Sequence, residues 1–210
     1  MAVPLFAFAK KEAVSDTISA RSALIDMPDR VLDLLPAGTR LDMLDYLAVD
    51  SVYRAPNALS GDSYIRELTP DYASVQLTGA STYVIKILKL KNGNDIIMTV
   101  RTAGTEGDSQ DSELAFYDTR FSPLPAENFI KAPALADFFS FPKGSQTNMK
   151  EIEAMLPFYT VSYEVSPGTD TLVARLTPGD FLTIEDRKLV ELFLRPALTY
   201  RWNGSTFKKS

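Results

Sequence analysis

The sequence of 210 residues contains no histidine and no cysteine, and these two absences restrict its chemistry more than any other feature. Without histidine there is no Ser-His-Asp triad, no imidazole base and no histidine-ligated metal. Without cysteine there is no disulfide, no thiolate metal site and no thiol nucleophile. What remains for chemistry is paired carboxylates, lysine or tyrosine bases, and cations held by oxygen ligands.

The sequence also lacks a basic face and a membrane-length apolar run. Lys and Arg number 22 against 27 Asp and Glu, and the formal net charge of -5 argues against a nucleic-acid partner. Because no run of about 18 apolar residues exists, no transmembrane segment is expected. Glycine patterns that cradle phosphates or dinucleotides are absent as well. The hydrophobic content of 45% is that of an ordinary globular protein.

Residues 1–21 are expected to be a leader with the remnant of a signal peptide. Ala7-Phe8-Ala9 ends an apolar stretch before Lys10-Lys11 and resembles the A-x-A cleavage site of secretory signals. The pattern predicts a periplasmic or otherwise exported protein, cleaved after Ala9. The alternative interpretation is an apolar N-terminal strand that packs on the body of the protein.

Residues 22–125 are predicted to begin with a helical hairpin. Pro28 fits the first turn of a helix over residues 31–35 that ends before Pro36-Ala37-Gly38. Thr39 then predicts an N-cap, with Asp42 at the capping-box position. The apolar stripe of this second helix is Leu41, Leu44, Leu47 and Ala48. Solvated faces and helix N-termini explain the acidic residues better than a cation site does: Asp26, Asp29, Asp33, Asp42 and Asp45.

From Ser63 onward the apolar period changes to two, which is typical of strands. The predicted strands cover residues 72–77, 83–90, 96–101 and 114–117. Asn92-Gly93 is a strong hairpin signal. The apolar phase slips between Ile87 and Leu88, which indicates either a bulge or burial on both faces. The pattern predicts an antiparallel meander of about four or five strands with the helical hairpin packed on one face.

Residues 126–147 are predicted to be a connector rich in proline and phenylalanine. Between Phe121 and Gly144 four prolines interrupt five phenylalanines, so long regular elements are excluded while the aromatic rings imply packing. The alternative is an aromatic surface that docks a peptide.

Residues 148–210 are predicted to form a smaller α+β part that ends in a β-hairpin. Asn148 and Glu151 predict a short capped helix, and Thr183 and Asp186 predict a second one. The first of these helices would face Met149, Ile152 and Leu156 inward, and the second would carry the apolar residues Leu189, Val190, Leu192 and Phe193. Strands are expected over residues 159–165, 172–176 and 198–202.

Asn203-Gly204 predicts a two-residue type I′ turn in the last hairpin. Such a turn would place Tyr200 opposite Phe207 and Trp202 opposite Ser205. Trp202 is interpreted as a core or rim aromatic residue, and the alternative is a residue that stacks on a ligand.

Few residues qualify as a site. The loop Gly104–Glu113 carries Glu106, Asp108, Asp111 and Glu113 and could hold calcium, but it lacks the order of an EF-hand loop. Arg201 has no partner that the pattern names. A carboxylate pair for glycoside hydrolysis cannot be recognised from spacing, because the two groups meet only in the fold. No catalytic, cofactor-binding or metal-binding residue is therefore assigned, and no cofactor is expected.

Several short segments together resemble a known family. They are Asp26-Met27-Pro28-Asp29, Arg40-Leu41-Asp42, Tyr117-Asp118-Thr119, Pro123-Leu124-Pro125, Glu185-Asp186-Arg187-Lys188 and residues 198–204. In this order and spacing, from about Ser22 to Phe207, they resemble the exported Bacteroidales proteins called domain of unknown function 3256. The resemblance implies export, a small α+β fold and no assigned enzymatic role.

Asp16-Thr17-Ile18 and Asp170-Thr171-Leu172 are similar to the Asp-Ser/Thr-apolar sequence that is O-glycosylated on exported proteins of that phylum. Thr17, in the leader, is the better candidate, and Thr171 is better explained as a strand residue.

The sequence therefore predicts an exported, non-catalytic envelope protein that acts as a binding or structural module, with a protein or glycan partner. Two alternatives stay open. One is a carboxylate-dependent hydrolase acting on envelope glycans, and the other is an inhibitor-like adaptor that presents a sheet face to a partner protein.

Overall fold

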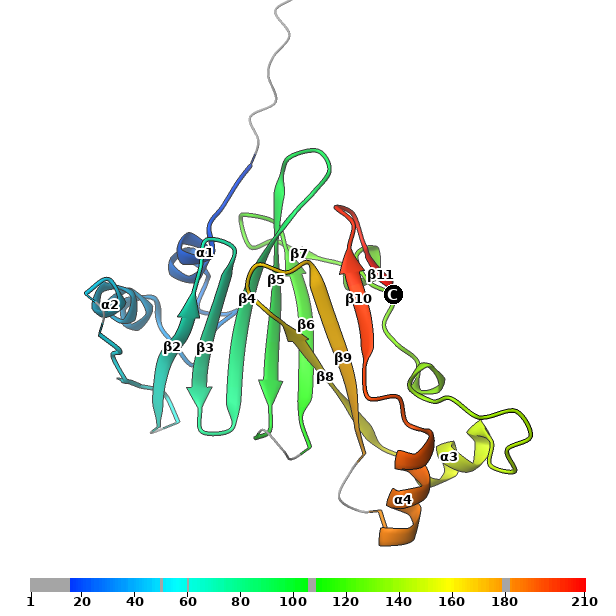
Figure 1. The fold of residues 1–210 in the computed structure, drawn as a ribbon. Helices are drawn as coiled ribbons and strands as arrows, with labels where there is room; N and C mark the ends of the chain where they lie inside the picture. The colour runs from blue at the N-terminus through cyan, green and yellow to red at the C-terminus, as the bar shows by residue number, and fades with distance from the viewer. Residues whose placement is uncertain (1–15, 50, 60, 106–108, 179–181) are drawn as a thin grey trace, which may run out of the picture.

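The computed structural model describes residues 16–49, 51–59, 61–105, 109–178 and 182–210 (Figure 1). These residues form an α+β fold with two antiparallel sheets, as predicted. The larger sheet is a meander in chain order: β1 (Ala55–Pro56), β2 (Asp62–Leu68), β3 (Tyr72–Thr78), β4 (Ser81–Lys89), β5 (Asp95–Ala103), β6 (Asp111–Tyr117) and β7 (Pro123–Leu124). It has seven strands rather than four or five, because a two-residue strand is added at each edge.

The smaller sheet has the order β11-β10-β9-β8, so the two parts of the chain do not share one continuous sheet. Its strands are β8 (Tyr159–Val165), β9 (Thr171–Pro178), β10 (Leu198–Trp202) and β11 (Phe207–Lys209). The remaining elements are α1 (Ala20–Asp26), α2 (Ala37–Leu47), the 3-10 turns η1 (Ala126–Asn128) and η2 (Leu135–Phe138), α3 (Met149–Met155) and α4 (Ile184–Phe193). The division of the chain at residues 22–125, 126–147 and 148–210 stays a prediction.

The first helix lies earlier than predicted. Its N-cap is Ser19, whose hydroxyl oxygen accepts a backbone N–H of the first turn. Met27 ends the helix with φ -57° and ψ 125°, because a proline disfavours the α region in the residue before it. Residues 28–36 form turns instead of the predicted helix, so Pro28 follows a helix end rather than opening a first turn.

The second helix begins two residues before the predicted N-cap at Thr39. Pro36 occupies the N-cap position and offers no side-chain acceptor, and Asp29 Oδ1 accepts the N–H of Ala37 at 3.1 Å instead. Its buried residues are Arg40, Met43 and Leu44, so the predicted stripe of Leu41, Leu44, Leu47 and Ala48 is wrong in its phase.

The large sheet is covered on both faces (Figure 1). We call one the helix face, because α1, α2 and the turns at 28–36 pack there on Ala73, Val75, Leu77, Ile85, Ile87 and Ile97. We call the other the sheet face, because the smaller sheet packs there on Leu88, Ile96, Met98 and Phe116. Side chains alternate across a strand, so each central strand contributes to both cores.

Burial on both faces explains the phase slip in β4. The pairing of β4 with β5 runs without a break from Ser81 opposite Ala103 to Lys89 opposite Asp95, so there is no bulge between Ile87 and Leu88. Six consecutive residues at the start of β5 are buried. The Asn92-Gly93 turn joins the two strands as predicted, with Gly93 at φ 87°.

The connector is packed, as predicted. Ile130 and Phe138 are buried in the core of the sheet face, and Phe129 stacks on Phe116 with ring centroids 4.9 Å apart. Residues 126–147 contain only the two 3-10 turns among regular elements.

The two C-terminal helices begin at their predicted caps. Asn148 Oδ1 accepts the N–H of Lys150, and Thr183 Oγ1 accepts the N–H of Asp186, both at 3.0 Å. Of the apolar residues of α4, Val190 and Phe193 are buried, whereas Leu192 has an exposed fraction of 73%.

The last hairpin corrects the predicted turn. Trp202 lies opposite Phe207 rather than Ser205, and Tyr200 lies opposite Lys209 rather than Phe207. The loop has four residues, because the side chain of Asn203 accepts the N–H groups of Ser205 and Thr206 and stabilises a wider turn.

Candidate functional site

The helix face holds a small pocket of about 330 Å³. Its polar groups are largely occupied or neutral. Arg101 forms an ion pair of 2.7 Å with Asp33, and this hydrogen bond lowers the pKa of the Asp33 carboxyl. Burial raises the pKa of the Tyr83 and Tyr117 phenols, so both are protonated at neutral pH. The pocket is also small compared with the two hollows described next.

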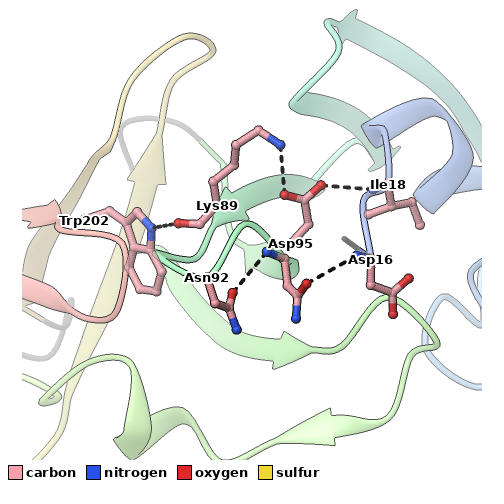
Figure 2. A network of polar contacts seen from close by, with 7 residues as sticks. Asp16, Ile18, Lys89, Asn92, Asp95 and Trp202 are labelled. Atoms are coloured by element: carbon pink, nitrogen blue, oxygen red, sulfur yellow. Dashed lines mark hydrogen bonds and ion pairs between the residues drawn. The ribbon is translucent and has the colours of Figure 1, made fainter. Parts of the chain in front are cut away.

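A second hollow, of about 1170 Å³, lies where the chain segment at 16–19 meets the β4–β5 hairpin and the last hairpin. Figure 2 shows how the Asp95 side chain holds this junction together. Its carboxylate accepts the N–H of Ile18 at 3.0 Å and pairs with Lys89 Nζ at 2.9 Å, although the Asp95 side chain is only 1% exposed. The N–H of Asp95 donates to the carbonyl oxygen of Asp16 at 2.9 Å.

The last hairpin is fixed to the same place. Trp202 Nε1 donates to the carbonyl oxygen of Lys89 at 2.8 Å, as Figure 2 shows. The N–H of Lys91 donates to the carbonyl oxygen of Gly204 at 2.9 Å. The polar groups of this junction are engaged in holding three chain segments together. We therefore regard it as a structural joint.

The third hollow is the candidate site. The smaller sheet covers β5 and β6 but leaves much of β2, β3 and β4 open, and a cleft of about 1050 Å³ lies between the two sheets. We call it the inter-sheet cleft. Its floor is formed by the outward side chains of the large sheet, chiefly Tyr64, Arg66, Tyr72, Ser74, Gln76, Thr82 and Val84.

The wall of the inter-sheet cleft is the second half of β8 and the turn that follows. Ser162, Tyr163, Glu164 and Val165 line it, followed by Ser166 and Pro167. The N–H of Tyr163 donates to Ser112 Oγ at 3.0 Å, which ties this wall to β6. The wall and floor thus come from strands that are far apart in the sequence.

The inter-sheet cleft is polar and electrically balanced. Its charged residues are Arg66, Glu67, Glu164 and Arg175. Arg175 Nη1 lies 2.6 Å from Glu164 Oε2, and Arg66 Nη1 lies 3.4 Å from Gln76 Oε1. Burial raises the pKa of the Tyr72 and Tyr163 phenols, which therefore act as neutral hydrogen-bonding groups.

Residues singled out in the sequence do not meet in this cleft. Trp202 is 8% exposed and packs on Phe207, with ring centroids 5.1 Å apart, so it is a core aromatic residue. Arg201 is exposed on β10 opposite Lys208. Thr171 opens β9 as a strand residue, as expected.

Two further candidates were the glycosylation site at Thr17 and the calcium loop Gly104–Glu113. Thr17 is exposed at the junction described above, between anchored neighbours, rather than in an unstructured segment. Its glycosylation stays a prediction. In the predicted calcium loop, Glu106 and Asp108 lie outside the described residues, while Glu113 lines the small pocket of the helix face. Across the described ranges, no three acidic side chains gather as a metal site would require.

Sequence reasoning missed the inter-sheet cleft. The available signal was the alternation in residues 72–77, which puts Tyr72, Ser74 and Gln76 together on the more polar face of the strand. That this face lies beside β8 depends on the packing of the two sheets, which no local pattern records.

Comparisons with known proteins agree with the fold. A family model described as "Protein of unknown function (DUF3256)" matches residues 13–207. The chain is also similar to the structure of a domain of an uncharacterized protein from Porphyromonas gingivalis W83, with a TM-score of 0.78 and 24% sequence identity over 94% of this chain and 99% of that chain. At this identity the similarity shows the shared fold. No curated protein matches.

Proposed function

The chain belongs to the DUF3256 family of proteins of unknown function, and from that premise we propose that it is an exported, non-catalytic binding protein of the cell envelope. Its binding site is the inter-sheet cleft. The predicted cleavage pattern at Ala7-Phe8-Ala9 supports export, although these residues lie outside the described part of the chain. In the described part, no helix has the length and apolar character needed to cross a bilayer.

The observation that carries the proposal is the open, polar surface of β2, β3 and β4. Most residues of β3, β4 and β5 are buried or half-buried, but on this part of the sheet face phenol, hydroxyl, amide and guanidinium groups line a cleft of about 1050 Å³. Sites that bind ligands are concave and carry a few well-placed polar groups. Rigid strands of two sheets position these groups, as a binding site requires.

Among the described carboxyl groups whose pKa is shifted, none has the raised pKa of a glycosidase acid. A glycosidase needs a carboxylic acid whose pKa is raised so that it can protonate the leaving oxygen. In the described residues, the carboxyl groups with a resolved shift are Asp33, Asp71, Asp118 and Asp137, and in each the pKa is lowered. None of the four lines the inter-sheet cleft.

Export is tested by mass spectrometry of the protein from its native host after cell fractionation. A mature N-terminus at Lys10, or a few residues beyond, in the envelope fraction supports it. An intact Met1 in the cytosolic fraction contradicts it.

Binding is tested by capture from the native envelope with the mature protein as bait. Thr82→Arg places a long charged side chain on the cleft floor, whereas Thr199→Arg makes the same change on β10, outside the cleft. We expect a specific partner to be retained by the wild type and Thr199→Arg and lost with Thr82→Arg. A partner retained equally by all three would contradict the assignment of the cleft.

A further inference from the structure

The exposed edges of the two sheets are protected in three of four cases. Natural sheets shield an edge strand with proline, lysine or short length, because unpaired backbone groups otherwise recruit another chain. β1 has two residues and includes Pro56, and β7 has two residues and includes Pro123. β11 has three residues and includes Lys208 and Lys209.

The fourth edge, β8, carries none of these protections. It has seven residues, YTVSYEV, without proline or lysine and with several residue types that favour strands. Its pairing with β9 is regular from Tyr159 opposite Pro178 to Val165 opposite Leu172, so no bulge turns the edge away. Among the described strands, β8 is therefore the longest edge strand that lacks proline and lysine.

The second half of this edge, residues 162–165, lines the inter-sheet cleft. The N–H of Tyr163 donates to Ser112 Oγ and so faces away from β9. In an antiparallel pair, outward and inward backbone groups alternate with a period of two. Val165 therefore directs its N–H and C=O outward as well, and both Tyr163 and Val165 line the cleft.

We propose that an extended peptide strand of a partner protein adds to β8 within the inter-sheet cleft. This inference rests on the proposed function, since it names the occupant of the same site. Strand addition supplies affinity through main-chain hydrogen bonds and specificity through alternate side chains. One side of the added strand would lie on the floor of the cleft, and the other would face solvent.

The cleft selects an uncharged strand. Its two arginines and two glutamates balance, and Glu164 is already paired with Arg175. A charged side chain directed at the neutral part of the floor, away from Arg66, would be buried without a partner, which is costly. Hydroxyl and phenol groups of Tyr72, Ser74 and Thr82 form that floor, so small polar side chains such as serine and threonine fit the inward positions.

Ser112 occupies one pairing position of the edge in the free protein. Its hydroxyl contacts Tyr163 N–H at 3.0 Å and Thr102 Oγ1 at 2.8 Å. Removing the hydroxyl with Ser112→Ala leaves the N–H of Tyr163 for an incoming carbonyl group. The variant should bind a strand roughly threefold to tenfold more tightly, the gain expected for one net hydrogen bond.

The probe is a random library of peptides of about eight residues, a typical strand length, displayed on phage and panned against the full mature chain. We expect enrichment of uncharged sequences rich in serine, threonine and β-branched residues. A synthetic peptide of the enriched type should slow hydrogen exchange of the Val165 amide about tenfold while leaving the Lys208 amide on β11 unchanged. Thr82→Arg should abolish binding, and Thr199→Arg should not.

The outcomes separate this inference from the function on which it rests. Failure to enrich any peptide, or a bound peptide that leaves exchange at Val165 unchanged, overturns strand addition. Binding of an envelope oligosaccharide pool that is lost with Thr82→Arg also overturns it but supports the inter-sheet cleft as the binding site. If neither peptide nor oligosaccharide binding depends on Thr82, both proposals are wrong.

Discussion

The two faces of the large sheet are built from the same strands and differ in how they are covered. On the helix face, two helices and a run of turns pack over the centre of the sheet around a pocket of about 330 Å³. On the sheet face, the smaller sheet lies over β5 and β6 and leaves a cleft of about 1050 Å³ over β2, β3 and β4. The difference teaches that the same strands form a hydrophobic core where a second layer packs on them. Where that layer ends, they leave a surface that can bind a ligand.

The largest expected effect is a loss of stability when the last hairpin is no longer anchored to the sheet face. Trp202→Ala should lower the free energy of unfolding by about 3–5 kcal/mol, because it empties a buried aromatic position and removes the hydrogen bond to Lys89. Urea denaturation followed by circular dichroism measures it. Leu192→Ala, at a site 73% exposed on α4, is the control and should stay within about 0.5 kcal/mol. A loss below about 1 kcal/mol for Trp202→Ala would show that the smaller sheet is not anchored through this residue.

The next prediction concerns the stability of the helix face and a charged residue that is buried in it, Arg40. Arg40 is 1% exposed, and Asp29 is its ion-pair partner at 2.9 Å. Arg40 Nε and Nη1 have no hydrogen-bond partner in the described structure. Asp29→Ala should therefore destabilise by about 3 kcal/mol, because it leaves a buried cation unpaired and also removes the acceptor for the N–H of Ala37.

Arg40→Met is the matched variant for the helix face. We expect it to be neutral or stabilising, because a well-packed apolar side chain replaces a charge that is costly to bury. Combined with Arg40→Met, Asp29→Ala should cost about 1 kcal/mol, the loss of the cap alone. Equal losses for Asp29→Ala in both backgrounds would contradict the coupling between the two residues.

Alkaline pH should lower the stability of both faces gradually, as their buried tyrosine phenols ionise. Burial raises the pKa of Tyr83 on the helix face and raises the pKa of Tyr200 on the sheet face to about 12. In the unfolded chain these phenols ionise near pH 10. Their contribution to stability is therefore complete below about pH 10, because the folded state retains the proton longer, and the part due to Tyr200 is lost as the pH rises through about 12.

This pH dependence is measured by denaturation at several pH values, together with tyrosinate absorbance. Tyr200→Phe should flatten the loss of stability between about pH 10 and 12, whereas Tyr46→Phe, at a site 49% exposed, serves as the control. Because the pKa of Tyr83 is raised more than that of Tyr200, Tyr83→Phe should remove the phenol that ionises at the highest pH in the tyrosinate titration. Unchanged stability of the wild type across this range would show that the phenols are not buried as described.

The smallest effect is expected in the inter-sheet cleft itself. Arg175→Ala breaks the 2.6 Å ion pair with Glu164, but the two side chains are 48% and 63% exposed, so the cost should be below about 1 kcal/mol. Thermal denaturation at low and high salt measures it, and the small loss should disappear at high salt. A loss of several kcal/mol would mean that this rim supports the fold rather than a ligand.

Local chemistry explains which parts of the fold could be predicted from the sequence. The turn at Asn92-Gly93 and the caps at Asn148 and Thr183 depend on residues within a few positions, and the structure confirms them. Pro28 is compatible with a helix on either side of it, because proline is favoured both in the first turn of a helix and just after a helix end. The side chain of Asn203 similarly supports two turns, and packing of Trp202 against Phe207 accompanies the wider one.

The candidate site was less predictable than the fold. Polar residues at Tyr72, Ser74 and Gln76 indicate only an uncovered strand face. What turns that face into a cleft is β8, whose Tyr163 meets Ser112 across 51 residues of sequence. Arg40 illustrates the same limit, because a charged residue on a helix is expected at the surface until its partner Asp29 is known.

The junction at the β4–β5 hairpin has a consequence for the order in which the chain assembles. The hairpin closes over a few residues, but Ile18 must find Asp95 across 77 residues, and Trp202 must find Lys89 across 113. Closing longer loops costs more chain entropy and slows folding, so the hairpin should form first and both chain ends should dock on it afterwards. During synthesis the meander would thus emerge with its sheet face bare, and the cleft would form only after β8 has emerged and the smaller sheet has packed over the core.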